Sequence, residues 1–204
     1  MSPSGAVGSN LRAVTRRAVQ AQIAAQAMRL FSERGFDETT VDQIAAAAGI
    51  SSRSFFRYFP TKEDVVVGDQ AEHGAALRAA LQARPSIEPP WVAIRHALGT
   101  LVDEIRADPV FALRASAVLL TTASLRARHL EKQLLWTELL VPEIVARLAD
   151  DTPRADLRAR AIVSAALICL DVALNQWIDS GGADDIGALL DAAVDAVTGQ
   201  PVER

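Results

Sequence analysis

The stretch TVDQIAAAAGISSRSFFRYF, residues 40–59, has the pattern of two short helices joined by a tight turn. Thr40 can cap the first helix, with Gln43 three residues later in a capping-box arrangement, and Ser51 can cap the second helix. Gly49 can supply the turn, and the small side chain of Ala45 allows the two helices to approach closely. The stretch therefore predicts a helix-turn-helix.

The second of these helices is rich in aromatic and basic residues. It contains four of the seven Phe and Tyr residues of the chain. Phe55 and Phe59 lie four residues apart and are expected to face the first helix as core residues. Phe56 is expected to border the outer face. The polar residues expected to face solvent are Ser52, Arg53, Ser54 and Arg57. Arginine can donate two hydrogen bonds to guanine, so this face predicts contact with a DNA major groove.

Other residues near this stretch are placed to contact the DNA backbone. The hydroxyl of Tyr58, the ammonium of Lys62 and Thr40 at its helix start can each reach phosphate. Arg16 and Arg17 precede the body of the first long helix and can reach adjacent backbone or the minor groove. The complete expected DNA-binding set is Arg16, Arg17, Thr40, Ser51, Ser52, Arg53, Ser54, Phe56, Arg57, Tyr58 and Lys62.

The charge is divided unevenly along the chain. Residues 1–62 carry 8 Lys+Arg and 4 Asp+Glu, whereas the remaining residues carry 13 and 21, for a total net charge of −4. The basic first part favours an anionic partner.

Helical patterns cover nearly the whole chain, because alanine, leucine and arginine dominate and β-branched runs are few. Beyond the helix-turn-helix, helices are expected over 11–34, from residue 61 to about 83, and over 91–107, 110–122, 124–149, 154–179 and 184–198. The sequence therefore predicts an all-α protein.

A longer stretch, RLFSERGFDETTVDQIAAAAGISSRSFFRYFPTKEDVV at residues 29–66, resembles the DNA-binding domain of the tetracycline-repressor (TetR) family. The steps Gly35-Phe36, Ala48-Gly49-Ile50-Ser51 and Tyr58-Phe59 fall at the spacing of that family. The resemblance implies phosphate contacts for Thr40, Tyr58 and Lys62. Phe56 stands where the family often has tyrosine, so an apolar contact, such as one to a thymine methyl, is expected there.

The resemblance also implies an all-α homodimer of about nine helices and a DNA operator as partner. Residues 1–62 would form an N-terminal arm and helix-turn-helix domain. Residues 63–204 would form a C-terminal domain that dimerises and binds a small-molecule effector. Repression would be relieved by that effector, although the sequence does not separate repressor from activator.

Two helices of the second part are candidates for the dimer interface. The middle of the helix at 154–179 is apolar nearly all round, so it needs cover on two faces. The helix at 184–198 carries an apolar stripe that could join it in a four-helix interface. Two-fold dimers also read paired DNA half-sites.

Polar and aromatic residues within these apolar helices are the candidates for an effector pocket. They are Trp91, Arg95, Phe111, Arg114, Trp136, Asp171 and Asn175. The arginines, with His129, could meet an anionic ligand, or they could be exposed or salt-bridged. Asp171 and Asn175, four residues apart, could line a cavity or bond across a dimer seam, and both alternatives stay open.

The stretch LRARHLEKQLLW, residues 125–136, loosely resembles a branch of the family in which some members bind long-chain acyl-CoA. This resemblance makes an acyl-CoA-like effector one candidate. The alternatives to a regulator are a small helical enzyme and a helix-turn-helix module that binds another protein. The three histidines are scattered and no nucleophile elbow or phosphate-binding glycine loop occurs, so we expect no catalytic residue, metal site or cofactor.

The expected location is the cytoplasm, without membrane contact. One cysteine, Cys169, permits no intrachain disulfide. The first ten residues, MSPSGAVGSN, resemble an unstructured tail more than a signal peptide. The longest apolar run, residues 161–170, is shorter than the roughly 20 residues that a membrane helix needs.

Overall fold

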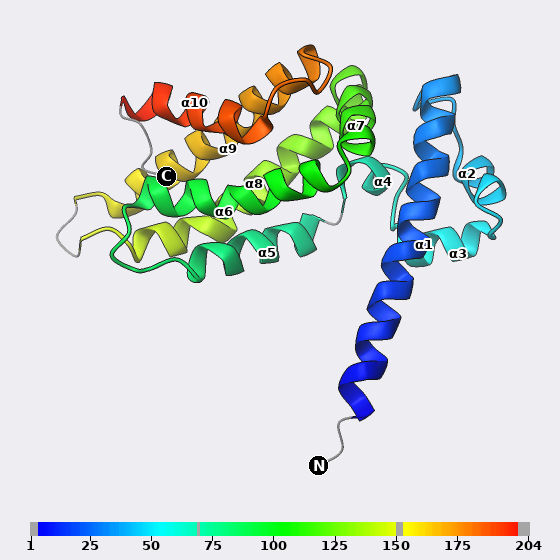
Figure 1. Cartoon of the computed structure of the whole chain (residues 1–204), viewed down its shortest axis with the longest axis horizontal. Coiled ribbons are helices and arrows are strands. Elements are labelled where there is room, and N and C mark those ends of the chain that lie inside the picture. The colour runs from blue at the N-terminus through cyan, green and yellow to red at the C-terminus, as the bar shows by residue number, and fades with distance from the viewer. Residues whose placement is uncertain (1–3, 69, 150–152, 200–204) are drawn as a thin grey trace. The chain divides into compact units, whose positions relative to one another are not determined.

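The computed structural model describes residues 4–68, 70–149 and 153–199, with side chains from Val14 onward. These residues form helices connected by short loops, without a strand. The helices are α1 Ser4–Arg34, α2 Val41–Ala47, α3 Ser52–Tyr58, α4 Asp64–Val67, α5 Gln70–Gln82, α6 Pro90–Ala107, α7 Pro109–Thr121, α8 Ala123–Val145, α9 Ala155–Asp179 and α10 Ile186–Thr198 (Figure 1). The expected all-α fold class is confirmed.

The chain forms two compact units. The first combines the residues up to Gly68 with Ala117–Arg126, and the second combines the remaining residues on either side of that segment. The first unit thus extends a few residues beyond the expected boundary at residue 62. Helices α7 and α8 each contribute residues to both units, and they meet at a bend of 105°.

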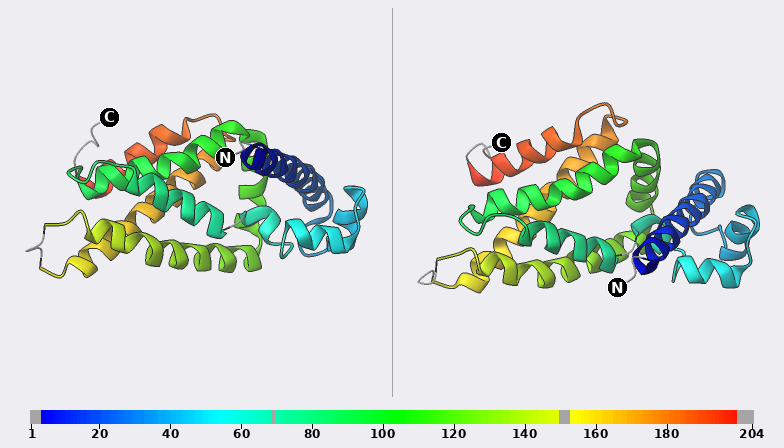
Figure 2. Two further views of the ribbon diagram at one scale, coloured as in Figure 1. Left: turned by 90° about the horizontal axis from the view of Figure 1, so that it is seen from below. Right: turned by 60° about the horizontal axis from the view of Figure 1, so that its bottom comes forward.

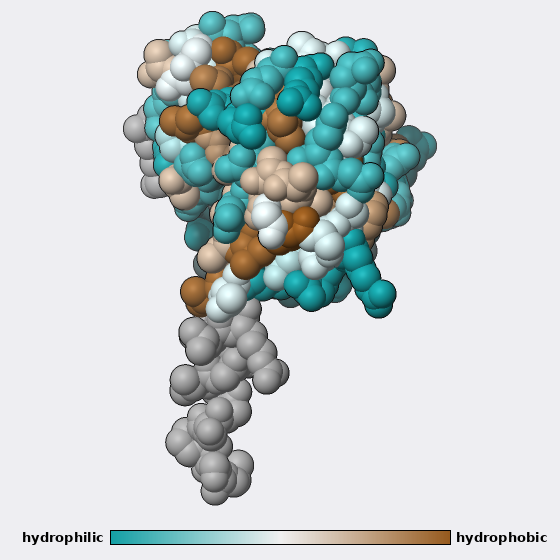
Figure 3. Space-filling view, turned by 90° about the vertical axis from the view of Figure 1, so that its right-hand side faces the viewer, coloured by the Kyte–Doolittle hydropathy of each residue, from teal (hydrophilic) through white to brown (hydrophobic). Residues whose placement is uncertain are grey.

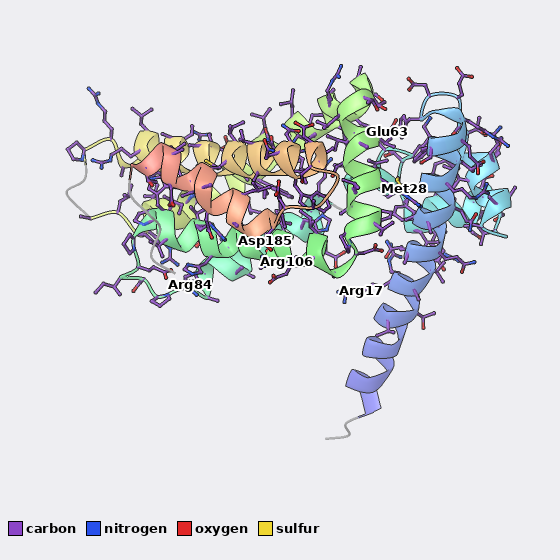
Figure 4. The ribbon with its side chains drawn as sticks, turned by 45° about the horizontal axis from the view of Figure 1, so that its top comes forward. Arg17, Met28, Glu63, Arg84, Arg106 and Asp185 are labelled. Carbon is purple, nitrogen blue, oxygen red and sulfur yellow. The ribbon has the colours of Figure 1, made fainter. Side chains whose placement is uncertain are left out.

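The first unit is built on α1, against which α2, α3 and α4 pack. Its core contains Ile23, Met28 and Phe31 from α1, Ile44 from α2 and Phe55 from α3, all of which are buried. Met28 is marked on α1 in Figure 4. The short α2 and α3 owe their stability to this packing, because isolated helices of seven residues are not stable in water.

The second unit is a bundle in which α5, α6, α8, α9 and α10 run alongside one another (Figure 2). Leu98, Ile144, Val163 and Leu190 are among its fully buried side chains. The end of α6 and the start of α10 are joined by Arg106, whose Nη2 donates to Asp185 at 2.7 and 2.8 Å (Figure 4).

Helices α5 and α8 are fastened to each other along their length. Trp136 Nε1 donates to the carbonyl oxygen of Gln70 at 3.0 Å, at the start of α5. In the middle, Arg78 Nε donates to Glu143 at 2.7 Å. At the end of α5, the Arg147 guanidinium donates to the carbonyl oxygens of Leu81, Arg84 and Pro85. The Arg147 bonds join the segment after α8 to the C-terminal end of α5 and to the loop that follows it.

Two expectations about the helices are wrong. The single helix expected from residue 61 to about 83 is broken at Gly68, which has φ +77° and ends α4. A left-handed φ of this kind stops a helix and is readily adopted by glycine. The N-terminal stretch expected to be an unstructured tail is helical from Ser4 onward as part of α1.

Across the described ranges, no single helix has both the length and the apolar character that crossing a bilayer requires.

Candidate nucleic-acid interface

Local signals fix both ends of α2 and the start of α3. Thr40 Oγ1 accepts from the Gln43 backbone at 3.3 Å, and Gln43 Oε1 accepts from the Thr40 backbone at 2.9 Å, which confirms the expected capping box. Gly49 has φ +71°, and it donates to Ala46 while Ile50 donates to Ala45, the two bonds of a Schellman turn. These contacts set the angle between the two helices.

Ser51 caps α3, because its Oγ accepts from the Ser54 backbone at 3.2 Å. Phe55 is fully buried and Phe59 nearly so, with ring centroids 5.8 Å apart, which confirms that these rings are core. The C-terminal end of α3 is held to α1 by Gln20, whose Nε2 donates to the Tyr58 carbonyl at 3.2 Å. The helix is therefore anchored at both ends.

Three side chains form the outward face of α3. Arg53, Phe56 and Arg57 are exposed, and their spacing of three and four residues places them on one side of the helix. We call these three residues the α3 face. Phe56 is 52% exposed, a large apolar surface beside two cations. Such a face offers guanidinium donors for base edges and an apolar ring for a thymine methyl.

The two serines expected on this face are less free than the sequence suggested. Ser52 is half-buried, and its hydroxyl donates to the Asp42 carboxylate of α2. The Ser54 hydroxyl accepts from Ser51 at 3.0 Å, within the cap of the helix. Asp42, which the sequence reading did not single out, therefore links α2 to α3. The Asp42 carboxylate lies on α2, whereas Arg53 and Arg57 lie on α3, and its bond to Ser52 stabilises the position of α3.

Tyr58 lies between two arginines. The guanidinium carbons of Arg57 and Arg16 lie 5.0 and 5.7 Å from the centroid of its ring, and Arg57 Nη2 donates to its hydroxyl at 3.3 Å. Arg17 is also exposed on α1 (Figure 4). Three cationic or hydroxyl groups from two helices thus meet at the end of α3. This arrangement suits a phosphate group.

Lys62 has a contact that the sequence did not reveal. Its Nζ donates to the carbonyl oxygens of Phe36 at 2.8 Å and Thr39 at 2.9 Å, and it lies 4.2 Å from the centroid of the Phe36 ring. Two of the three ammonium donors are therefore used inside the unit. Lys62 closes the loop between α1 and α2 and thereby positions the start of α2.

Hydrophilic residues cover much of the face of the molecule in Figure 3, with smaller hydrophobic areas between them. The exposed apolar side chains of the first unit include Val14 and Phe56.

The residues expected to line an effector pocket are distributed over the second unit. Arg95 of α6 forms an ion pair with Asp191 of α10 and also donates to the Gly187 carbonyl, so it ties two helices together. Arg114 and Asn175 are exposed. Trp91 and Phe111 are half-buried, and Trp91 packs against the core.

Asp171 is bonded to two residues of α8, His129, which the sequence had suggested for an anionic ligand, and Gln133, which it had not. Asp171 accepts from His129 Nε2 at 3.0 Å and from Gln133 Nε2, both on α8. It therefore faces its own unit, whereas Asn175 lies on the exposed side of α9. The structure separates the two residues that the sequence had paired. Lys132, between His129 and Trp136 on α8, lies over the Trp136 ring at 4.8 Å.

Comparisons with known proteins agree with this geometry. A family model described as bacterial regulatory proteins, tetR family, matches residues 23–67, and one described as MftR C-terminal domain matches residues 88–200. The chain is 30% identical over 176 residues to the HTH-type transcriptional regulator TcmR of Streptomyces glaucescens, covering 83% of this chain and 77% of that protein. It is also 30% identical over 126 residues to MftR of Mycobacterium tuberculosis, covering 62% and 64% of the two chains.

Solved structures show the same fold. FadR of Thermus thermophilus, described as a TetR family transcriptional repressor in complex with lauroyl-CoA, is 26% identical, with a TM-score of 0.52 over 91% of this chain and 96% of that one. FadR of Bacillus halodurans is 18% identical, with a TM-score of 0.62 over 91% and 97%.

Proposed function

Because this chain belongs to the TetR family of bacterial regulatory proteins, we propose that it is a repressor that leaves its operator when an apolar effector binds. Members of this family are transcriptional regulators that bind DNA, and this chain is one of them rather than an enzyme. A bacterial regulator of this kind acts on DNA in the cytoplasm, where we place this protein.

The observation that carries the proposal is the exposed α3 face. Arg53, Phe56 and Arg57 are presented outward by a helix whose other side is buried and whose two ends are anchored. A rigid, cationic helix of this kind fits the major groove, where each good bidentate contact to a base contributes about 1–3 kcal/mol of discrimination. Arg16, Arg57 and Tyr58 would bind the adjacent phosphates.

Binding as a homodimer is supported by α9 and α10, which pack on each other in the second unit. Ile168 and Val172 are 52% and 55% exposed on one side of α9, and Val197 is 57% exposed on α10. Ala188, Ala192 and Ala196 add an exposed row of small residues to α10. A second copy would cover this apolar surface, and two α3 helices would then read half-sites about 34 Å apart.

The proposed effector carries a long acyl chain. The similar repressor of Thermus thermophilus is described in complex with lauroyl-CoA, and the second unit of this chain is rich in apolar helices. Effector and DNA would oppose each other through a coupling free energy, commonly about 1–3 kcal/mol.

Helices α7 and α8 offer a route for this coupling, because each contributes residues to both units. A ligand that shifts the parts of α7 and α8 in the second unit would also move their parts in the first unit.

A mobility-shift assay with genomic fragments tests the proposal. We expect a two-fold symmetric footprint, binding that weakens steeply as salt increases, and release of the DNA by lauroyl-CoA. Arg53→Ala should weaken specific binding by at least about tenfold, in keeping with one lost base contact. Arg158→Ala, an exposed arginine on α9, is the matched control and should bind like the wild type. Absence of any specific fragment, or equal loss in both variants, would refute the proposed function.

A further inference from the structure

A cluster of polar residues lies within the second unit at the meeting of α5, α8 and α9. We call Gln70, His129, Lys132, Trp136 and Asp171 the Lys132 cluster. The members are linked by contacts: Gln70 accepts from Trp136, Lys132 lies over the Trp136 ring, and Asp171 accepts from His129. Asp171 is also close enough to act electrostatically on Lys132. All five belong to the same unit.

Several polar groups in this cluster lack a partner among the residues that the structure describes. The buried Gln70 side chain, 9% exposed, has no hydrogen-bond acceptor for Nε2, and the buried Nδ1 of His129 also has no partner. Lys132 is half-buried, and its ammonium lies over the face of the Trp136 ring. Buried polar atoms without hydrogen-bond partners destabilise a folded protein unless a ligand or water binds them.

Both oxygens of the Asp171 carboxylate accept hydrogen bonds from residues other than Lys132. One of its oxygens accepts from His129 and the other from Gln133. Burial of the Lys132 ammonium outweighs the attraction of Asp171 and lowers the pKa of Lys132 to about 8. An incompletely compensated cation of this kind gains from an additional anion nearby.

Apolar side chains continue from the cluster along the same helix. Asp171, Leu174 and Ile178 lie at spacings of three and four residues and therefore share one side of α9. Leu174 and Ile178 pack against the core but are only partly buried. Apolar surface is thus available for a chain-like ligand beside a polar end.

We propose that the Lys132 cluster binds the anionic oxygen group of an otherwise apolar effector, with Lys132 and Gln70 as its hydrogen-bond donors. The ligand class is a long-chain carboxylate or a molecule with an equivalent anionic oxygen, and its apolar part lies along Leu174 and Ile178. This inference rests on the proposed function and specifies the chemistry of the effector site.

Calorimetric titration of the full-length protein with sodium laurate and with 1-dodecanol tests the charge requirement. The two probes share a twelve-carbon chain, and only laurate carries an anionic oxygen group. We expect laurate to bind about 10- to 100-fold more tightly than the alcohol, the range of a charge-assisted hydrogen bond. Equal affinities, or no binding of either probe, would overturn the proposal.

Two variants assign that preference to the cluster. Lys132→Met keeps an unbranched side chain, one atom shorter and without charge, and should abolish the preference for laurate. Gln70→Met keeps the backbone carbonyl that binds Trp136 and should weaken laurate binding severalfold without loss of stability, because its amide nitrogen has no partner to lose. The exposed control Arg158→Met should bind both probes like the wild type. An unchanged preference in folded Lys132→Met would overturn the assignment.

The DNA assay separates this inference from the proposed function. Lys132→Met should still bind the operator but should no longer release it at laurate concentrations that release the wild type. If no genomic fragment is bound while laurate binding still depends on Lys132, the regulator proposal fails and the ligand site stands. If the operator is bound but laurate does not bind the protein, the ligand-site proposal fails and the regulator proposal stands.

Discussion

Replacement of Lys132 by methionine is expected to stabilise the free protein, although it removes a charge with an aspartate nearby. The pKa of Lys132 is lowered from 10.5 to about 8, mainly because burial disfavours the charged form. Each pKa unit corresponds to about 1.4 kcal/mol, so the charged side chain costs the folded state about 3 kcal/mol. That shift already includes the attraction of Asp171. The lost contact with the Trp136 ring offsets about 0.5–2 kcal/mol, which leaves a net gain of about 1–3 kcal/mol for Lys132→Met.

The effect has a defined dependence on pH. Below pH 8 both the folded and the unfolded chain hold the proton of Lys132, so the whole penalty is present. Between pH 8 and 10.5 the unfolded chain holds the proton more tightly than the folded chain, and the wild type gains stability as pH rises. The difference between wild type and Lys132→Met should therefore be full at pH 7 and should shrink as pH rises through this window.

Urea unfolding of both proteins at pH 7 and pH 10, at one protein concentration, measures this difference. Arg158→Met is the control, because Arg158 is exposed and its replacement should change the free energy of unfolding by less than about 0.5 kcal/mol at either pH. A Lys132→Met protein that is less stable than the wild type at pH 7, or a gain that does not change with pH, would refute the reasoning.

Three further predictions concern the first unit. Arg53→Ala should reduce the discrimination between bases at one operator position by about 1–3 kcal/mol, whereas Tyr58→Phe should weaken binding to all DNA sequences similarly. A binding assay over single-base operator variants distinguishes the two effects. A uniform loss of affinity for Arg53→Ala would contradict its role in base recognition. Lys62→Met should lower the free energy of unfolding by about 1–3 kcal/mol, because two bonds from a charged donor are lost, without changing the salt dependence of DNA binding. A salt slope reduced by about one would instead identify Lys62 as a phosphate contact. Gly49→Ala should lower the free energy of unfolding, measured by heat or urea, by about 1 kcal/mol. The loss comes from the left-handed backbone alone, because no atom lies within 4 Å of the added carbon. An unchanged stability would show that the turn tolerates a different conformation.

Local chemistry explains which features the sequence could predict. Thr40 and Ser51 cap helices through atoms within three residues of themselves, and Gly49 adopts the backbone that its turn requires. Helical periodicity also explains why Phe55 is buried and the adjacent Phe56 is exposed. Such signals need no knowledge of distant partners, so the helix-turn-helix could be derived from residues 40–59 alone.

Features that depend on distant partners were not predictable in the same way. Lys62 binds carbonyl groups more than twenty residues earlier in the chain, and Ser52 is held by Asp42 of the preceding helix. Asp171 and Asn175 share one helical face by spacing, but Asp171 is bonded to His129 of α8, whereas Asn175 is exposed. Helical periodicity defines a face and does not identify the helix that will cover it.

The sequence singled out Trp136, Asp171 and His129 of the Lys132 cluster, but not Lys132 or Gln70, because these two residues are ordinary on their own. Lys132 follows a glutamate in a polar stretch of α8, where solvent exposure is the usual outcome. Its proximity to Asp171 of α9 is not encoded by any residue spacing. The break at Gly68 was likewise hidden within a pattern that reads as one helix.

The division of α7 and α8 between the two units bears on protein engineering. A gene fragment ending at Gly68 would encode the α3 face but would lack residues 117–126, including the buried Thr122 and Leu125. Such a truncated product would lose part of its own interior. A chimera that joins the first unit to the ligand-binding domain of another protein therefore needs both of its segments, the residues up to Gly68 and Ala117–Arg126. The second segment contains the bend between α7 and α8.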